Sequence, residues 1–482
     1  ATWYLEDGDI TVIANENGQS VKQGSNSAVA DSDTVITQRD SEKATDNTIT
    51  VSTTDDTTAN ITIEDVNINS YGDAIDVGSS GANITLEGDN KLNSEYGSGL
   101  HVSDGDVTIT GSGSLEAGSK NDSNNNAAIG SHENEAMSGD ITIGGDAQVT
   151  AVSRDDGAGI GSGDMGEMSG DITIGDNAQV TAWSETGGAG IGSGRESNMS
   201  GNITIGGSAQ VTAGSNSETA GIGSGNNGVF TSTGRVVIRD SAKVTAIGEN
   251  EGAGIGTGED ELMAGMIIIQ DNAQVTAIAG DRAAAIGSDN LDEMTGTIII
   301  IGNARVTTGI LDDDVYFDYN TKEIKYTLDE NATGYIGDSK YSNHESDEGH
   351  YIIGPDVTIN GISGSDIEAL KDYINMRLSG ENHDGEPENL TKLDVRSENG
   401  EFTVTAEGEG AVEKILYGGS ENVPTAPGTY PVTCVVRIGE ETIEFQIDTY
   451  VVPEPAPQPE PMAHHTRIQL YRVADKQGRS IA

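Results

Sequence analysis

The stretch G-D-I-T-I-G-G-D-A-Q-V-T-A at residues 139–151 decides the fold, because it returns with small changes along the chain. Further copies begin at Gly170, Gly201, Gly234, Gly265 and Gly296. The first strand residue of these copies recurs 31 residues apart, with one step of 33 residues, at Ile141, Ile172, Ile203, Val236, Ile267 and Ile298. Self-similarity at a fixed period of about 20–50 residues is typical of an architecture of stacked repeats.

Each repeat holds three short stretches of alternating apolar residues, separated by Gly, Asp, Asn and Ser. The third stretch reads G-A-G-I-G-S-G at Gly157, and upstream the period shortens to 23 residues from Ile61 to Ile84. Three strands in one such unit fit a coil of a parallel β-helix, since a propeller blade needs four strands in about 40–45 residues. We therefore predict an all-β chain with a right-handed parallel β-helix, three strands per coil, over residues 60–310.

Strand alternation predicts which side chains are buried. Ile141 and Ile143 should point inward and Thr142 outward, while the third strand should leave bare glycine backbone on its outer face. A recurring methionine before the first strand predicts a buried corner stack of Met137, Met168, Met199, Met263 and Met294. The outer position of the first strand becomes apolar at Val237, Ile268 and Ile299. We expect residues 310–362 to cover that strip, because exposed apolar strips are rare.

The remaining chain divides by composition. Ser365 and Glu368 form a capping-box pattern ahead of an apolar run, which predicts a helix that closes the repeat stack. The abrupt beginning and end lead us to expect a piece of a longer protein. The predicted segments are an N-terminal cap with first coils (1–59), the repeats (60–310), an aromatic-rich insertion with the last coil (311–364), a capping helix and linker (365–387), a small Ig-like β-sandwich (388–452) and a Pro-rich linker with a tail (453–482).

The chain is strongly acidic, with 79 Asp and Glu against 25 Lys and Arg and a net charge of −54. This charge repels nucleic-acid phosphates and favours solubility, so we expect no nucleic-acid partner. It also suits calcium, which takes carboxylate and carbonyl oxygens, although an acidic surface needs no cation. Cys434 stands alone, and no apolar run is long enough to insert into a membrane.

The insertion holds the candidate site residues. Tyr316, Tyr319, Tyr326 and Tyr335 could stack on sugar rings, because tyrosine offers an apolar face and a polar tip. The alternative is that they pack over the apolar strip. The adjacent Asp312, Asp313 and Asp314 are the candidate calcium ligands, with a solvated acidic loop as the alternative.

The motifs D-I-T-I, A-Q-V-T-A and G-A-G-I-G-S-G resemble repeats of cell-surface proteins of Gram-positive gut and rumen anaerobes. The stretches L-E-G-D-N-K-L-N-S at Leu86 and D-V-T-I-T-G-S-G-S-L at Asp106 resemble a family of carbohydrate-binding β-helix proteins. This likeness covers about residues 60–305, and it implies binding of a polysaccharide with calcium as a possible cofactor. G-T-Y-P-V-T-C at Gly428 resembles bacterial Ig-like stalk modules.

Two functions follow as expectations. The first is a non-catalytic extracellular adhesin or carbohydrate-binding protein at the bacterial cell surface, which presents a rigid acidic surface to a polysaccharide or host glycan. The alternative is a polysaccharide lyase or glycoside hydrolase on the same scaffold, for which a hydrolase needs converging carboxylates, one with a raised pKa. The acidic residues of this chain lie mostly in repeating turns, which favours the first function.

Overall fold

The structure is a computed structural model, and it describes residues 1–54, 57–259, 262–289, 294–313, 315–338, 349–370, 373–374, 390–398 and 401–454. Strands make up 51% of it and helices 1%, so the all-β prediction is confirmed. Among the described residues, no helix is long and apolar enough to cross a membrane.

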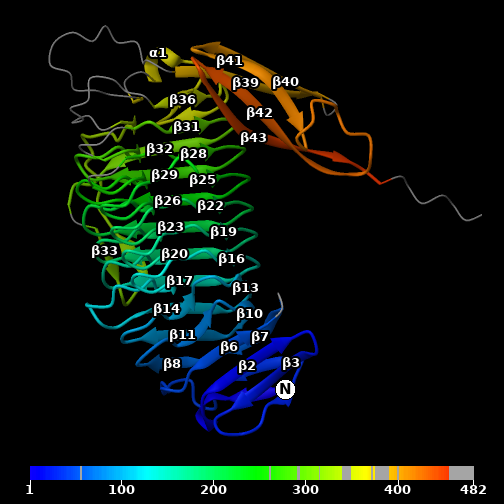
Figure 1. Cartoon of the computed structure of the whole chain (residues 1–482). Coiled ribbons are helices and arrows are strands. Elements are labelled where there is room, and N and C mark those ends of the chain that lie inside the picture. Colours follow the sequence, from blue (N-terminus) through cyan, green and yellow to red (C-terminus); the bar gives the residue numbers. More distant parts are fainter. Residues whose placement is uncertain are drawn as a thin grey trace, which may run out of the picture.

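Most strands belong to three long sheets that run side by side along the molecule (Figure 1). We call them sheet 1, sheet 2 and sheet 3, in the order in which each repeat contributes a strand to them. Sheet 1 contains, in spatial order, β1 (Thr2–Tyr4), β5 (Thr34–Thr37), β7 (Thr58–Glu64), β10 (Gly81–Glu87), β13 (Val107–Gly111), β16 (Ile141–Ile143), β19 (Ile172–Ile174), β22 (Asn202–Ile205), β25 (Arg235–Ile238), β28 (Met266–Ile269), β31 (Thr297–Ile300), β36 (His350–Ile353), β39 (Leu390–Glu398) and β40 (Glu401–Gly408).

The other two sheets follow the same spatial order from the N-terminal end. Sheet 2 contains β8 (Asn67–Ser70), β11 (Asp89–Ser94), β14 (Ser114–Ser119), β17 (Gln148–Ser153), β20 (Gln179–Ser184), β23 (Gln210–Ser215), β26 (Lys243–Ile247), β29 (Gln274–Ala279), β32 (Arg305–Ile310), β37 (Thr358–Ile359) and β38 (Ile362–Ser363). Sheet 3 contains β4 (Val29–Ala30), β3 (Gly18–Gln23), β2 (Ile10–Asn15), β6 (Ile49–Thr53), β9 (Ile75–Gly78), β12 (Leu100–Val102), β15 (Ile129–Gly130), β18 (Ile160–Gly161), β21 (Ile191–Gly192), β24 (Ile222–Gly223), β27 (Ile255–Gly256), β30 (Ile286–Gly287) and β35 (Ile336–Gly337).

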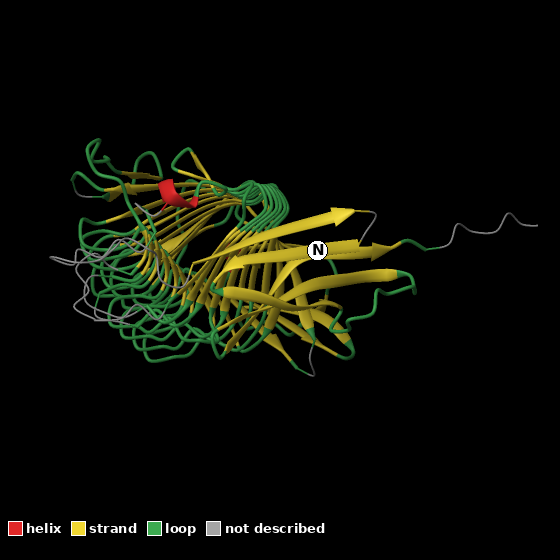
Figure 2. Cartoon of the chain, turned by 90° about the horizontal axis from the view of Figure 1, so that it is seen from above, coloured by secondary structure: helices red, strands yellow, loops and turns green. Residues whose placement is uncertain are grey.

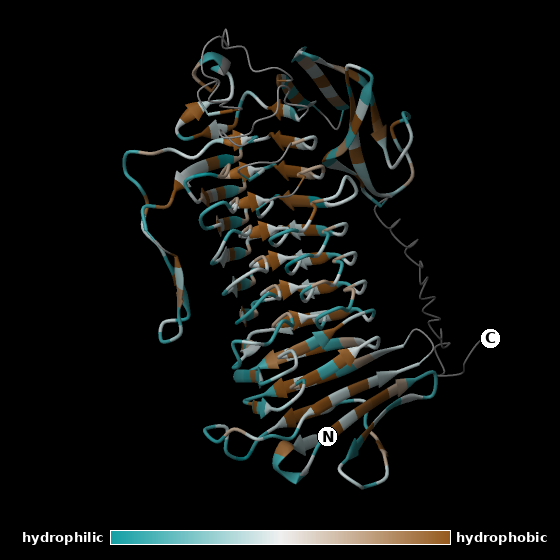
Figure 3. Ribbon diagram, turned by 60° about the vertical axis from the view of Figure 1, so that its left-hand side comes forward, coloured by the Kyte–Doolittle hydropathy of each residue, from teal (hydrophilic) through white to brown (hydrophobic). Residues whose placement is uncertain are grey.

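Equivalent residues of successive repeats pair in parallel, one directly above the next. Ile141 pairs with Ile172, and Ile172 pairs with Ile203. Seen along the stack, the strands enclose one narrow interior (Figure 2), and the apolar positions recur from strand to strand (Figure 3). These isoleucines are fully buried in one continuous core cluster. Burying each such side chain contributes about 1.5–3 kcal/mol, so the shared interior is the main source of stability.

The predicted methionine stack is present. Met137, Met168 and Met199 are fully buried and bridge one another in parallel, and Phe230 fills the gap before Met263. The expected bare glycine face is wrong, because the third-strand glycines are buried. Gly161 has φ +142°, and a Cβ there would lie 1.7 Å from the Gly192 carbonyl oxygen. At these glycine positions the backbone conformation would direct a Cβ into the carbonyl oxygen of the next coil, so only glycine fits there.

The N-terminal end is closed by a local antiparallel arrangement. β2 pairs in parallel with β6 on one side and antiparallel with β3 on the other, and β3 pairs antiparallel with β4. A short 3-10 helix, η1 (Leu5–Asp7), places Leu5 in the core. β3 therefore covers the edge of β2, the first parallel strand of sheet 3, which limits edge-to-edge association with another molecule.

The outer strip of sheet 1 is covered by the C-terminal strands, so the prediction that residues 310–362 cover it is wrong. β41 (Gly410–Tyr417), β42 (Gly428–Ile438) and β43 (Glu441–Val452) form a three-stranded antiparallel sheet. Its inner side chains, including Cys434 and Phe445, pack in one cluster with Ile268 and Ile299. The strip is apolar because a second layer lies on it.

The aromatic-rich insertion packs instead on the outside of sheet 2. Its hairpin of β33 (Tyr316–Asp318) and β34 (Glu323–Lys325) buries Phe317 and Ile324 against Trp183. The hairpin packs on the position that follows the A-Q-V-T-A stretch of a repeat. Val152, Trp183, Ile247 and Ile278 occupy this position and form a second outer apolar strip. Lys322 anchors the tip of the hairpin through an ion pair with Glu116, at 2.6 Å.

The segment predicted as a separate Ig-like β-sandwich shares a strand layer with the repeats. β39 pairs in parallel with β36 and antiparallel with β40, so both extend sheet 1. Of the predicted capping helix, the structure describes α1 (Ile367–Leu370), while residues 371–372 and 375–389 lie outside the described residues. Most of the Pro-rich linker and tail, residues 455–482, also lies outside them.

The two-layer packing generates a test within one ladder of sheet 1. Ile299→Ala removes a fully buried side chain at the interface and should destabilise the C-terminal layer by about 2–4 kcal/mol. Thr173→Ala, at the uncovered position of the same ladder, should cost less than about 0.5 kcal/mol. Cys434 is fully buried in this layer and reports its opening through the rate of thiol labelling.

We expect slow labelling of Cys434 in the wild type, because burial raises the pKa of this thiol to about 12. Labelling should accelerate at least tenfold in Ile299→Ala and stay unchanged in Thr173→Ala. Equal labelling rates in both variants would contradict the assignment of this strip as an interface.

Candidate functional site

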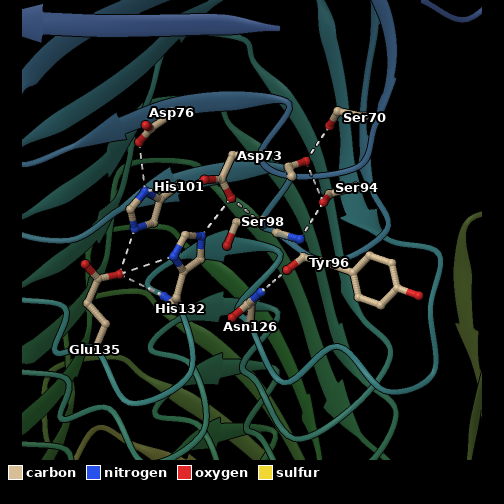
Figure 4. Close-up of polar contacts among 12 residues, drawn as sticks. Ser70, Asp73, Asp76, Ser94, Tyr96, Ser98, His101, Asn126, His132 and Glu135 are labelled. Carbon is tan, nitrogen blue, oxygen red and sulfur yellow. Dashed lines mark hydrogen bonds and ion pairs between the residues drawn. The ribbon is translucent and has the colours of Figure 1, made fainter. Parts of the chain in front are cut away.

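A cluster of histidines and carboxylates lies around the neighbouring strands β9, β12 and β15 of sheet 3, in the N-terminal part of the stack (Figure 4). Three successive coils supply it. Asp73 lies in the turn between β8 and β9, His101 in β12, and His132 directly after β15. The parallel stacking brings these residues together although they are as far as 59 residues apart in the sequence.

The two imidazole rings are stacked face to face. Their centroids lie 3.7 Å apart and their planes differ by 3°. Asp73 faces one ring nitrogen of each: its Oδ1 lies 2.7 Å from His132 Nε2, and its Oδ2 lies 3.8 Å from His101 Nδ1. The backbone N–H of Ser98 also donates to Asp73 Oδ1 at 2.7 Å, which fixes the carboxylate in place.

Glu135 faces the opposite edge of the ring pair. Its Oε2 lies 2.7 Å from His101 Nε2 and 3.7 Å from His132 Nδ1. Asp76 Oδ1 lies 2.8 Å from His101 Nδ1. Three carboxylates therefore surround two imidazoles, and each ring nitrogen faces at least one carboxylate oxygen.

Both histidines stand where later coils carry glycine. His101 pairs with Gly130 in the next coil, and Gly161, Gly192 and their successors continue that ladder. A Cβ on Gly163 would lie 2.4 Å from the His132 backbone, which marks Gly163 as the next residue in the His132 column. Gly130 has φ +141°, and a Cβ there would lie 1.7 Å from the Gly161 carbonyl oxygen, so glycine is favoured at this position in the later coils.

The charges of the cluster favour a protonated His101. Burial lowers the pKa of this imidazole, but hydrogen bonds to Asp76 and Glu135 and the charge of Asp73 outweigh burial and raise the pKa to about 9. For Asp73, burial again opposes the net shift, and the hydrogen bond and charge of His132 lower the pKa. The surrounding carboxylates Asp73, Asp76 and Glu135 therefore favour the positively charged form of His101.

Two exposed tyrosines lie in the turns that lead into strands β9 and β12, next to the cluster. Tyr71 is 74% exposed and Tyr96 is 52% exposed. Their ring centroids lie 4.7 Å apart with a tilt of 47°, and the Tyr96 backbone N–H donates to the Tyr71 carbonyl at 2.9 Å. The sequence holds few aromatic residues, 4% in all, so two adjacent exposed rings form a distinct aromatic surface.

Buried polar side chains hold the two tyrosine turns in place. Ser94 Oγ donates to the Gly72 carbonyl at 2.7 Å and accepts from the Gly97 N–H at 2.6 Å. The Asn126 side chain donates to the Tyr96 carbonyl at 2.9 Å. The aromatic pair therefore stands on a fixed backbone, so little order has to be gained when a ligand binds.

The predicted tyrosine site is dispersed in the structure. Tyr335 is 3% exposed, so its ring cannot receive a sugar. Tyr319 helps to dock the hairpin, because its ring packs on Phe317 and under the Arg154 guanidinium and its hydroxyl donates to Glu185. Tyr316 and Tyr326 remain 56% and 36% exposed.

The predicted calcium ligands lie at the exposed end of β32. The backbone N–H of Asp312 donates to the Thr327 carbonyl at 3.1 Å, and the side chains of Asp312 and Asp313 face solvent. Asp314 lies outside the described residues. Over the described part of the chain, the group that could hold a metal ion is Asp73, His101 and His132. Calcium at the aspartates remains a prediction.

A second perturbed carboxyl bears on the enzyme alternative. Burial, and next the charge of Asp156, raise the pKa of Asp164 to about 6. A raised pKa is what a general acid of a glycosidase needs. Asp164 is only 3% exposed, however, so a polysaccharide cannot reach it in this conformation.

Sequence reasoning missed both the histidine cluster and the Tyr71–Tyr96 pair. One signal was available, because His101 and His132 interrupt glycine columns of the repeat. Comparisons of the chain with protein-family models, curated proteins and solved structures found no match.

The raised pKa of His101 generates a prediction on stability. A histidine whose pKa is higher in the folded chain than its usual value of about 6.5 stabilises the fold fully below pH 6.5. That stabilisation, about 3 kcal/mol, should disappear as the pH rises to about 9. Denaturant unfolding in EDTA should therefore show the wild type losing this stability relative to His101→Gln between pH 6 and 9.5. Parallel curves for the two proteins would refute the assignment.

Proposed function

We propose that the chain is a right-handed parallel β-helix of an extracellular bacterial surface protein, and that it binds a polysaccharide or host glycan without catalysis. The observation that carries this proposal is the exposed Tyr71–Tyr96 pair on a rigid turn. Aromatic faces pack against the C–H faces of sugar rings, and phenolic hydroxyls hydrogen-bond to sugar hydroxyls.

The surroundings of the pair suit a neutral or cation-bridged sugar chain. Lys120, Asn121 and Asp122 occupy the following turn and, with Glu95, line a shallow hollow next to Tyr96. These side chains offer hydrogen-bond donors and acceptors beside the aromatic faces. The stacked coils extend the surface along one axis, which matches a repetitive polymer.

The surface location rests on the resemblance of the repeats to Gram-positive surface proteins, and the acidic charge of −54 is compatible with it. The non-catalytic assignment is favoured because Asp164, a carboxyl with a raised pKa, is almost fully buried and so cannot contact a polysaccharide. We include calcium as a bridging ion to acidic sugars, for which the acidic turns would supply oxygen ligands.

The test is a screen of the full chain against a glycan array and soluble polysaccharides, with and without EDTA. We expect retention of at least one polysaccharide without release of shorter products. For the polymer retained, Tyr71→Ala/Tyr96→Ala should weaken binding at least about fivefold, since each lost stacking contact is worth about 0.5–1.5 kcal/mol.

Tyr316→Ala is the matched control, because it removes a similarly exposed tyrosine from the hairpin. We expect this variant to bind like the wild type. Binding lost in Tyr316→Ala but kept in the double variant would move the site to the hairpin. Release of oligosaccharide products by the wild type would overturn the non-catalytic assignment.

A further inference from the structure

We propose that Asp73, His101 and His132 bind one divalent transition-metal ion of the Zn²⁺ class. One carboxylate oxygen and two imidazole nitrogens from these residues lie within 4.8 Å of one another. They come from three coils that the core holds in fixed register, so the donor set is largely assembled before an ion arrives.

The donor atoms select the kind of ion. Two imidazoles and one carboxylate suit Zn²⁺, Co²⁺, Ni²⁺ or Cu²⁺, whereas Ca²⁺ and Mg²⁺ take oxygen ligands. The site is therefore chemically distinct from the acidic turns elsewhere on the chain. It also differs from the calcium site predicted at Asp312, Asp313 and Asp314, which offers only carboxylate side chains.

The spacing is close to what a tetrahedral ion needs. Bonds of about 2.0–2.1 Å place two ligand nitrogens about 3.3 Å apart. The ring centroids lie 3.7 Å apart, the donor atoms of the three residues all lie within 4.8 Å of one another, and Asp73 already contacts His132 at 2.7 Å. Parallel rings direct their nitrogen lone pairs along parallel lines, so the ion must tilt the rings towards each other. It takes the place of the proton between Asp73 and His132.

Glu135 supplies the outer support that such sites use. Metal-bound histidines usually donate their second N–H to a carboxylate, which orients the ring and strengthens the ligand. Glu135 Oε2 faces His101 Nε2 at 2.7 Å and His132 Nδ1 at 3.7 Å, on the side of the rings opposite Asp73. Asp76, 2.8 Å from His101 Nδ1, is placed to become a fourth ligand or to hold a bound water.

The experiment uses Co²⁺ as the probe, because its visible absorption reports nitrogen and oxygen ligands and coordination number. The full chain, freed of metal, is titrated with Co²⁺ in excess Mg²⁺, which occupies oxygen-only sites. His464→Asn/His465→Asn serves as the background, so that the paired histidines of the tail cannot contribute. We expect one equivalent of bound Co²⁺ with a four- or five-coordinate spectrum, and displacement of that ion by Zn²⁺.

Four variants distinguish residues that bind the ion directly from residues that support those ligands. Asp73→Asn and His132→Asn should weaken Co²⁺ binding more than tenfold and change its spectrum. Glu135→Gln should weaken binding about tenfold and keep one equivalent, as outer-shell losses do. His350→Asn, which removes a histidine paired with Glu441 elsewhere, should bind like the background protein.

The midpoint of thermal unfolding shows whether each variant folds. If the variants do not fold, the Co²⁺ titration of the background protein is the test of the proposal. No spectral change in the background protein, or an octahedral spectrum like that of Co²⁺ in water, would overturn the proposal. Unaltered binding by folded Asp73→Asn and His132→Asn would do the same.

Discussion

Register between successive coils is the constraint on which the rest of this structure depends. A coil of short strands has too little apolar surface to be stable alone, so it must place its isoleucines on those of its neighbours. Ile141, Ile172 and Ile203 meet this need by pairing in line. A slip of one residue would turn every apolar side chain outward, which makes the register strongly specified.

The same register creates the candidate sites. Because equivalent positions lie one above another, an unusual residue in one coil meets unusual residues in the adjacent coils. His101 and His132 replace glycine in neighbouring coils and their rings stack at 3.7 Å. Tyr71 and Tyr96 come together for the same reason. Function on this scaffold is therefore expected where the repeat is broken, close to its N-terminal end.

The sequence supported the pairing of repeats and the buried methionine stack, because both depend on a period that can be counted. It did not show what covers the outer strips. The apolar outer positions Val237, Ile268 and Ile299 indicated that another segment covers this strip. Whether the insertion or the C-terminal strands cover it depends on the path of the chain in space, which the repeat pattern does not encode. The Asp73–His132 contact was hidden because it joins residues 59 positions apart in repeats of different length.

The most direct test of in-register stacking is a distance between spin labels at Gln148 and Arg305, in a Cys434→Ser background. Both positions are exposed and belong to one ladder, five strand steps apart through residues 179, 210, 243 and 274. At about 4.8 Å per step, in-register stacking predicts one narrow distance distribution centred near 24 Å. A broad distribution, or a distance between the two labels beyond about 35 Å, would contradict in-register stacking.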